Sequence, residues 1–333
     1  MTASVRLSNF LHLVGAHCSS TSVQNVLRYD GIELSEAMVF GLGAGLGFWY
    51  LHDPDTSPTH RFNGRAPDLE GNFYRHIGHL LQWAEEWSPT EMAAQLSAGR
   101  PLLAQTDIYH LPYYDPPVHF PGHGIVVTGI DLPAQTIDLA DIQSPDHYTI
   151  ALADFQQAVG HYHPPMLWSN HWAAPPKLTA DRVATEIVTP ETLRQSILTV
   201  TQRMLTPPDK SEGLPAMQQM AEVLPTWGEA PDFVWAARFA YQAIEKRGTG
   251  GGGFRTLYSA FLAEAEAHLP ALATIDSAQR TNALGEQWRV LAGHFKQIFI
   301  KQEPTKFQAA SAVLQQIVDE EAGLMAALAQ AAQ

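Results

Sequence analysis

The chain of 333 residues contains one cysteine, Cys18. A single thiol cannot form an internal disulfide, and it cannot supply the sulfur ligands of a cysteine-rich zinc site. Basic residues are also scarce, with 20 Lys and Arg against 34 Asp and Glu and a formal net charge of −14 at pH 7. This charge disfavours nucleic acids and anionic membranes as partners, because both bind positively charged surfaces.

Long apolar runs are absent as well. No run approaches the length of a membrane-spanning helix. Residues 1–6 lack the charged start and the apolar stretch of a signal peptide. A free thiol without a partner is typical of a reducing compartment. We therefore expect a cytoplasmic protein with neither a membrane segment nor a secretion signal.

The patterns along the chain predict two domains. Helical patterns follow Cys18 and cover residues 69–87, and β-like runs occupy residues 101–104, 124–130 and 136–140. Beyond residues 173–176 the pattern is almost entirely helical. Thr189 and Pro190 there form a typical helix start, and apolar stripes at helical spacing begin at Leu193, Phe254, Leu284 and Phe307. We predict an α+β domain over residues 1–175 and an α-helical domain over residues 176–333.

Cys18 is the strongest chemical candidate. It lies in a polar segment, residues 15–21, directly before a helical pattern. The unpaired N–H groups and the dipole at a helix start lower the pKa of a thiol and favour the thiolate. A buried structural thiol is the alternative, since lone cysteines often act as small hydrophobic residues. The polar neighbours favour a nucleophile.

A cysteine nucleophile needs a base and a group that orients the base. His123 stands directly before the apolar run 124–130, and Asp141 follows the return strand 136–140. An antiparallel hairpin brings these two ends together. His119, four residues upstream in a proline-rich and aromatic loop, is the rival base, but a strand fixes a side chain better than a loop. The order Cys, His, Asp is that of papain-like cysteine enzymes.

Longer segments carry a resemblance to a known family. Residues 17–21 with 25–27, residues 34–43, and residues 119–123 with the strand after them resemble the N-terminal domain of the butirosin biosynthesis protein H family. Residues 245–255 resemble the helical domain that accompanies it. The similarity spans most of the chain.

The resemblance implies a fold like that of the bacteriocin-leader cysteine peptidases, within the papain-like group. It implies an acyltransferase of antibiotic biosynthesis, in which Cys18 takes an acyl group from an acyl carrier protein thioester and delivers it to an amine. The implied catalytic residues are Cys18, His123 and Asp141. No cofactor is implied beyond the phosphopantetheine arm of the carrier, and the oligomeric state stays open, a homodimer included.

This chain differs from the related peptidases at the position of the oxyanion donor. The related peptidases have a glutamine about six residues before the cysteine, where this chain has His12. The backbone N–H of Cys18 and a second donor, with His12 as a candidate, would then stabilise the oxyanion. Candidates for the substrate pocket, taken from the same segments and the neighbouring aromatic loop, are His17, Gly43, Gly45, Tyr113 and His119.

Two glycine-rich stretches need a separate interpretation. Glycines alternate over residues 41–47 after a helical pattern rather than after a strand, which argues against dinucleotide binding. Their missing side chains would let the backbone pass close to the active site. Residues 248–253 lack a Walker lysine, and form either a flexible break between helices or a mobile loop over the substrate. The histidines at 76 and 79, or at 161, 163 and 171, lack ligands at a recognised spacing, so we expect no metal.

Three functional classes remain open. The first is the acyltransferase, the second is a cysteine peptidase or amide hydrolase of the same fold, and the third is a binding protein without catalysis. The sequence does not show whether the acyl group is transferred to an amine or to water. An acidic carrier would need a local basic patch, for which Lys246, Arg247 and Arg255 are candidates.

Overall fold

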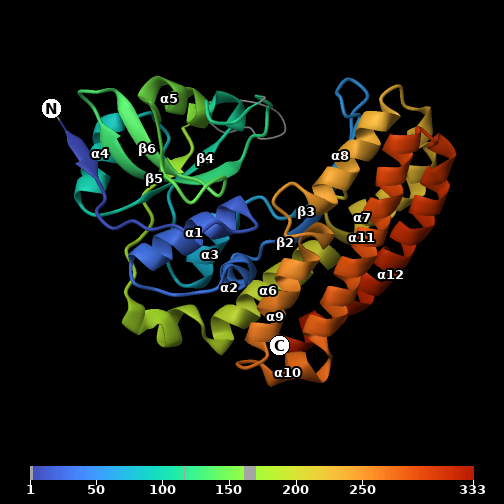
Figure 1. Ribbon diagram of the computed structural model, residues 1–333. Helices are drawn as coiled ribbons and strands as arrows, with labels where there is room; N and C mark the ends of the chain where they lie inside the picture. The colour runs from blue at the N-terminus through green and yellow to red at the C-terminus, as the bar shows by residue number, and fades with distance from the viewer. Residues whose placement is uncertain (1–2, 116, 161–169) are drawn as a thin grey trace. The chain divides into compact units, whose positions relative to one another are not determined.

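The computed structural model describes residues 3–115, 117–160 and 170–333. The chain forms two compact units, one of Met1–Val39 with Ile77–Ile187 and one of Phe40–His76 with Val188–Gln333. The fold is α+β, and Figure 1 shows a sheet in the first unit and a set of long helices in the second.

The first unit is built on an antiparallel sheet in the order β7-β6-β5-β4-β8, with β1 pairing the end of β5. Its strands are β1 (Ser4–Arg6), β4 (Leu102–Thr106), β5 (His123–Asp131), β6 (Thr136–Ala140), β7 (Tyr148–Ala151) and β8 (Trp172–Ala173). The predicted hairpin is confirmed, because β5 pairs with β6 from Val126 opposite Ala140 to Asp131 opposite Thr136.

Helices α1, α4 and α5 complete this unit. They are α1 (Cys18–Tyr29), α4 (Pro89–Ser97) and α5 (Leu152–Gly160). Helix α1 begins at Cys18 as predicted and packs on β5. It is unusual in burying a run of polar side chains, residues 18–22 and 24–25, together with Val23, Val26 and Leu27. Buried polar side chains are uncommon and need hydrogen-bond partners, so this first turn is a candidate functional region.

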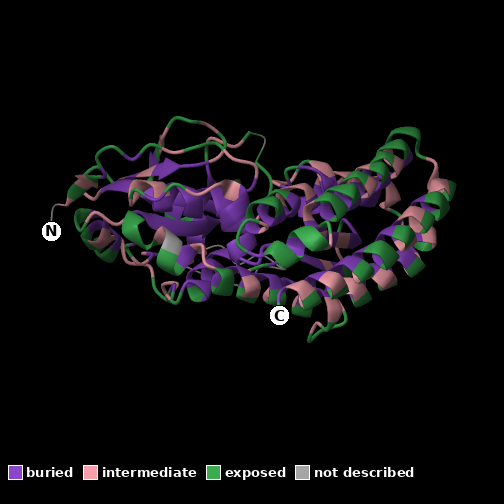
Figure 2. Ribbon diagram, turned by 90° about the horizontal axis from the view of Figure 1, so that it is seen from below, coloured by how far each residue is buried: buried purple, intermediate pink, exposed green. Residues whose placement is uncertain are grey.

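The second unit combines a two-stranded sheet with the C-terminal helices. The sheet is formed by β2 (Leu46–His52) and β3 (His60–Arg65). The helices are α3 (Leu69–His76), α6 (Pro190–Leu205), α7 (Gly213–Val223), α8 (Phe233–Glu245), α9 (Arg255–Ala265), α10 (Pro270–Thr274), α11 (Ser277–Lys301) and α12 (Phe307–Ala331). Figure 2 shows the long helices with buried residues on one side and exposed residues on the other, as their apolar stripes predict.

The segment 40–76 therefore groups with the C-terminal helices, which differs from a single boundary near residue 175. Helix α2 (Glu36–Leu42) begins in the first unit and ends in the second. The reason is aromatic packing within the second unit. Phe40 stacks on Phe254 at 5.8 Å between ring centroids, and Phe62 contacts Phe295 at 6.5 Å. These pairs are distant in sequence, so local patterns do not indicate them.

The helix expected over residues 69–87 is shorter than predicted. It ends as α3 at His76, and Gly78 has a φ of +79°, which a glycine adopts readily and which stops a right-handed helix. The sequence pattern does not predict the strands β2 and β3 either. Among the described residues, no helix has the length and hydropathy to cross a membrane.

The glycine run 248–253 is a left-handed turn whose second half, Gly251 to Gly253, is buried. Gly250 to Gly253 all have positive φ, and Phe254 follows with φ +72°. A methyl group at Gly252 would lie 2.7 Å from the carbonyl oxygen of Gly285 in α11. Buried Arg255 bonds the Gly253 carbonyl at 2.7 Å and pairs with the buried carboxylate of Glu321. The run is a packed connection within the second unit, and a role as a mobile loop over the substrate stays a prediction.

Candidate active site

Cys18 stands at the first position of α1, and the residue before it caps the helix. His17 has the extended backbone of an N-cap, and its ring Nδ1 accepts the N–H of Ser20 at 3.4 Å. Cys18 is 5 % exposed. The helix N–H groups at this end leave partial positive charge beside the sulfur.

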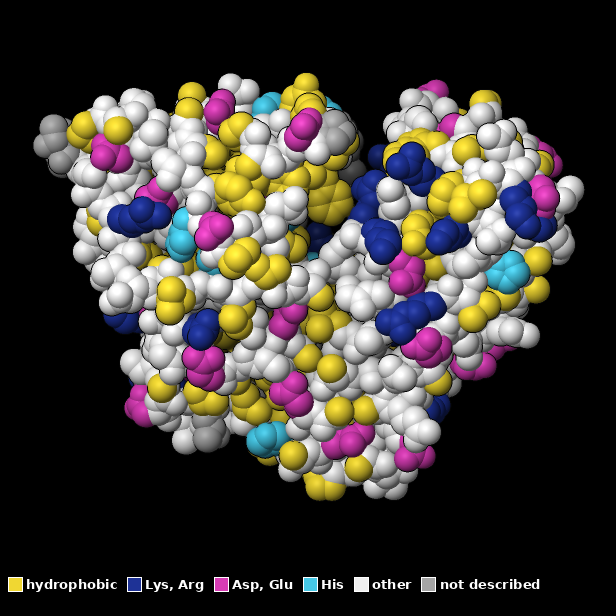
Figure 3. Space-filling model, in the orientation of Figure 1, with side chains coloured by type: hydrophobic (Ala, Val, Ile, Leu, Met, Phe, Trp, Pro, Cys, Tyr) yellow, Lys and Arg dark blue, Asp and Glu magenta, His cyan; other side chains and the backbone are white. Residues whose placement is uncertain are grey.

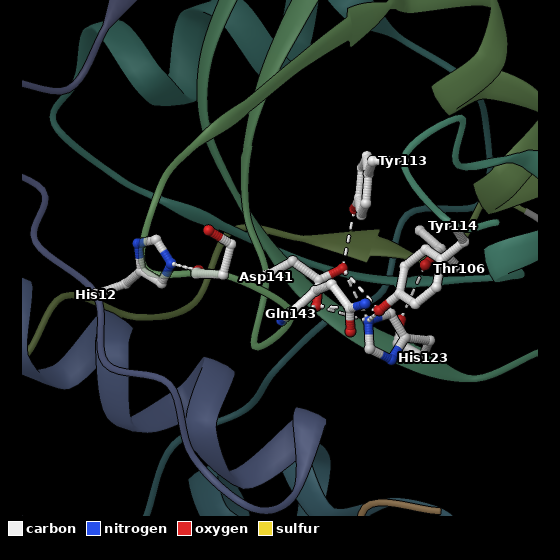
Figure 4. A network of polar contacts seen from close by, with 8 residues as sticks. His12, Thr106, Tyr113, Tyr114, His123, Asp141 and Gln143 are labelled. Carbon is white, nitrogen blue, oxygen red and sulfur yellow. Dashed lines mark hydrogen bonds and ion pairs between the residues drawn. The ribbon is translucent and has the colours of Figure 1, made fainter.

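His123 and Asp141 meet at the end of the β5–β6 hairpin. His123 is the first residue of β5, and Asp141 directly follows β6. The ring Nε2 of His123 lies 2.9 Å from Oδ1 and 3.0 Å from Oδ2 of Asp141, as Figure 4 shows. Both side chains are buried. The predicted neighbourhood of these two residues is confirmed.

The second partner of His123 is Cys18. Burial by itself lowers the pKa of His123, but the charge and hydrogen bond of Asp141, together with a hydrogen bond to Cys18, outweigh burial and raise that pKa to about 10. Since Nε2 faces Asp141, the other ring nitrogen, Nδ1, is the one that serves the sulfur. The ring is therefore an imidazolium at neutral pH, held between the carboxylate of Asp141 and the sulfur of Cys18.

Two tyrosines complete the surroundings of Asp141. Tyr113 donates to Oδ2 at 2.9 Å, and Tyr114 lies 3.3 Å from Oδ2 and 3.1 Å from the ring Nε2 of His123 (Figure 4). Burial and the charge of Asp141 raise the pKa of both phenols, so both stay protonated and donate. Burial favours a raised pKa for Asp141, but the charge of His123, these donors and the N–H of Gln143 hold it below its usual value.

The loop that carries the tyrosines is closed at its base by Asp107. One oxygen of this buried carboxylate accepts the N–H groups of Tyr109 and Phe120, and the other lies 2.8 Å from Nδ1 of His119. His119 also stacks on Tyr109 at 4.0 Å. The rival base thus belongs to a separate pair that holds the loop, whereas His123 is the histidine that contacts Asp141 and Cys18.

Close approach of α1 to β5 depends on Gly124. A methyl group on this residue would lie 3.0 Å from Cα and 3.1 Å from N of Ser19, the residue after Cys18. Contacts this short are rare for a Cβ, and here the neighbouring atoms are backbone atoms that cannot swing aside. The missing side chain of Gly124 lets the first turn of α1 reach His123.

His12 lies apart from the His123 ring. Its Nε2 is 2.7 Å from the carbonyl oxygen of Ser144, and its ring packs edge-on against His147 at 5.1 Å. In Figure 4 it stands on the far side of Asp141 and Gln143 from His123. A carbonyl oxygen only accepts, so the Nε2 hydrogen of His12 is already used. The role of His12 as oxyanion donor stays a prediction.

Three of the residues expected in the substrate pocket, His17, Gly43 and Gly45, have structural roles. His17 caps α1. Methyl groups at Gly43 and Gly45 would lie 2.7 Å from Leu69 and 2.6 Å from Phe40, so these glycines serve close packing within the second unit. Their assignment to a substrate pocket gains no support from these contacts.

The next question is whether the described residues could bind a metal ion. Within residues 3–115, 117–160 and 170–333, no group of three or more His, Cys, Asp or Glu side chains is arranged to hold a metal ion. His161 and His163 lie outside the described residues. His76 bonds the Leu42 carbonyl at 2.6 Å and Thr199 at 3.1 Å.

A cationic and aromatic surface covers part of α8 and α11. Arg238 lies over the ring of Trp235, Arg247 over Phe239, and Lys296 over Tyr241, at 5.9, 4.4 and 5.8 Å from the ring centroids. Figure 3 shows Lys and Arg side chains gathered with hydrophobic ones over α8. In the described part of the chain, Arg238, Lys246 and Lys296 form no ion pair with Asp or Glu.

One of the three residues expected to form a basic patch, Arg255, is not on the surface. Arg255 is 1 % exposed and paired with Glu321, so it does not reach the surface. Lys246 is exposed and Arg247 partly exposed at the end of α8. We define the α8–α11 surface by Trp235, Arg238, Phe239, Tyr241, Lys246, Arg247 and Lys296.

Together, the sheet, the cysteine at a helix start and the His–Asp pair at a hairpin end define an α+β protein with a candidate cysteine active site, joined to a helical unit. Residues 17–142 match the family model "Butirosin biosynthesis protein H, N-terminal", and residues 175–328 match "Domain of unknown function (DUF4872)". The two matches together correspond to the two-domain architecture of the butirosin biosynthesis protein H family. No curated protein matches the chain.

Proposed function

We propose that this protein is a biosynthetic cysteine acyltransferase that moves an acyl group from a carrier-protein thioester, through Cys18, to an amine. The single observation that carries this proposal is the buried His123, bonded to Asp141 on one side and to Cys18 on the other. This is the arrangement that activates a thiol and moves a proton to and from a reacting group. The family name supports a role in antibiotic biosynthesis.

A papain-like fold of the first unit is part of the proposal. Its support is the order of the elements, with the nucleophile at the start of a helix packed on an antiparallel sheet, the base at a strand start and the acid after the neighbouring strand. In such enzymes the acid holds the imidazole in the tautomer that serves the sulfur. The bond from Asp141 to Nε2 leaves Nδ1 for this task.

The first half of the reaction forms an acyl-enzyme. The Cys18 thiolate attacks the thioester carbonyl carbon, and a new carbon–sulfur bond forms. The tetrahedral intermediate collapses with cleavage of the bond to the carrier's sulfur. The leaving thiolate takes the proton of His123, which becomes neutral. Asp141 and the two tyrosines keep the ring in place during this transfer.

The second half delivers the acyl group. The amine nitrogen attacks the carbonyl carbon of the acyl-cysteine, and neutral His123 takes a proton from this nitrogen. The bond to Cys18 breaks, which gives an amide and restores the thiolate–imidazolium pair. Transfer to an amine requires that water be kept away. The burial of Cys18, His123 and Asp141 supports this, since all three are at most 5 % exposed.

The oxyanion of both intermediates needs two donors. The backbone N–H of Cys18, at the start of α1, is the first in our proposal. His12 is the candidate for the second. Because its Nε2–H already bonds the Ser144 carbonyl, it would have to donate from Nδ1, which requires a ring that carries both protons.

The proposal is tested by mass spectrometry of the acyl-enzyme. We expect S-acyl pantetheine, a small thioester without a carrier, to add one acyl mass to the protein, on the peptide that contains Cys18. In Cys18→Ala the adduct should disappear and turnover should fall about a thousandfold or more, because the nucleophile is lost.

The product then separates the three functional classes. An amine acceptor added to the acyl-enzyme should yield an amide. If only the free acid forms with every amine tried, the protein is a hydrolase. If no acyl group reaches Cys18 from any thioester or amide, the catalytic proposal fails and a binding role takes its place.

We also propose that the carrier protein docks on the α8–α11 surface. The chain carries a net charge of −14, yet this surface gathers Arg and Lys side chains over partly exposed aromatic rings. Arg and aromatic residues are enriched at protein interfaces, and positive charge attracts an acidic partner.

Charge reversal on this surface provides a second prediction. In Arg238→Glu with Lys296→Glu, the KM for a carrier-bound thioester should rise about tenfold, since the electrostatic attraction is reversed. The rate with S-acyl pantetheine should not change. Arg280→Glu, at an exposed arginine in the first turn of α11, is the matched control. An equal loss with both substrates would contradict docking at this surface.

A further inference from the structure

Glu36 holds the segment that leads into the nucleophile. This residue lies in the first turn of α2, within the first unit. Its Oε2 accepts the backbone N–H of Ala16 at 2.9 Å, and its Oε1 accepts that of His17 at 2.7 Å. Oε1 also accepts the hydroxyl groups of Ser20 at 3.0 Å and Thr21 at 3.1 Å. One carboxylate thus fixes four donors on both sides of Cys18.

The fit around Glu36 is tight. A methyl group at Gly15 would lie 2.1 Å from Oγ1 of Thr21 and 2.7 Å from Oε2 of Glu36, so only glycine fits there. His17 is bonded at its N–H by Glu36, at its Nδ1 by the N–H of Ser20, and at its carbonyl by Thr21. The residue before Cys18 therefore has its backbone fixed on both sides. Charge-assisted bonds of this kind are stronger than neutral ones.

We propose that Glu36 is a positioning residue for Cys18: it fixes the first turn of α1 so that the sulfur meets the ring of His123. The proposal rests on the proposed function only in taking Cys18 as the nucleophile. The oxygens of Glu36 are occupied by the backbone N–H groups of residues 16 and 17 and by the hydroxyl groups of Ser20 and Thr21, so Glu36 acts through these donors.

An electrostatic role and a positioning role of Glu36 predict opposite changes in the reactivity of Cys18, which makes the proposal testable. A negative charge beside a thiol disfavours the thiolate, so a purely electrostatic role predicts a more reactive Cys18 when Glu36 is neutralised. A positioning role predicts a less reactive one, because the first turn of α1 shifts and the bond from Cys18 to His123 is weakened. In the Glu36→Gln variant the amide –NH₂ would face the N–H of Ala16, which sets two donors against each other without an acceptor.

The experiment measures alkylation of Cys18 by iodoacetamide between pH 5 and 9 in Glu36→Gln. Since Cys18 is the only cysteine, the reaction reports on this residue alone. We expect the rate at pH 7 to fall about tenfold or more, because small displacements of reacting groups are costly. Glu33→Gln is the matched control. Glu33 lies in the connection between α1 and α2, three residues before Glu36, and its exposed side chain pairs with Arg28. Its alkylation rate should equal that of the wild type.

A second variant covers the case in which Glu36→Gln does not fold. Thr21→Val removes one of the four donors at nearly constant volume and should slow alkylation several-fold. An unchanged or faster rate in either folded variant overturns the proposal. The test does not depend on acyl transfer: if Cys18 accepts no acyl group while both variants slow alkylation, the proposed function fails and the positioning role stands.

Discussion

Replacement of Asp141 by asparagine is expected to slow acyl-enzyme formation about 10³- to 10⁴-fold near pH 8, because the imidazole loses the carboxylate that orients it. Asp141 has two effects on His123. It fixes the ring through Nε2, at 2.9 and 3.0 Å, and its charge keeps the ring protonated. An amide can keep one hydrogen bond but supplies no charge, and its –NH₂ group favours the wrong tautomer.

The pH dependence of this variant has a definite sign. Asp141 raises the pKa of His123 to about 10 against the opposing effect of burial. Without the carboxylate, burial is opposed by Cys18 alone, so the pKa of the ring falls below its wild-type value. The deficit should therefore be largest between about pH 7 and 9, and should narrow above pH 10, where the wild-type ring is also neutral.

Single-turnover acylation across this pH range measures the effect. Asp146→Asn is the matched control, because Asp146 is exposed and lies five residues further along the chain. A rate within tenfold of the wild type at pH 8 would exclude Asp141 from the catalytic group. Tyr113 and Tyr114 would then have to be reconsidered as the groups that hold the ring.

Replacement of Gly124 by alanine is expected to reduce acylation and alkylation of Cys18 about 10- to 100-fold in a folded protein. The added methyl group would meet backbone atoms of Ser19 at 3.0 and 3.1 Å. The first turn of α1 must then retreat by a few tenths of an ångström, and the sulfur moves away from His123. Overpacking of this size costs about 1–3 kcal/mol of stability, which a domain of ordinary stability tolerates.

The comparison with Gly293→Ala isolates the geometric effect. Gly293 lies in α11, and an added methyl group there meets no atom within 4 Å. That variant should keep the wild-type rates and the wild-type melting temperature or a slightly higher one, because helical alanine is favoured over glycine. If Gly124→Ala keeps full reactivity of Cys18, the close approach of α1 and β5 is not needed for activation.

The candidate site could be predicted from the sequence to the extent that it depends on local patterns. A polar helix start at Cys18 and a hairpin between His123 and Asp141 are short-range features, and both are found. Local patterns do not predict the role of Glu36, because its partners lie 15 to 20 residues away and a glutamate is common at a helix start. A carboxylate near a nucleophile shows its role only when its donors are known.

The two tyrosines and the segment 40–76 illustrate a different limit. Tyr113 and Tyr114 lie in an irregular loop, and no periodicity says that their hydroxyl groups reach Asp141. The glycines at 43 and 45 looked like the wall of a pocket. They accommodate Leu69 and Phe40, which only the three-dimensional packing reveals, and their place in a substrate pocket stays a prediction.

The carboxylate of Asp107 has a consequence for how this protein can vary. It binds both ends of the loop at Tyr109, His119 and Phe120, while Asp115, Pro117 and Val118 between them are exposed. When hydrogen bonds hold the two ends of a loop together, residues at its tip can be inserted, deleted or replaced without disturbing the strands on either side. Changes at Asp115, Pro117 and Val118 should therefore be tolerated, whereas changes at Tyr113 and Tyr114 would disturb the hydrogen bonds to Asp141.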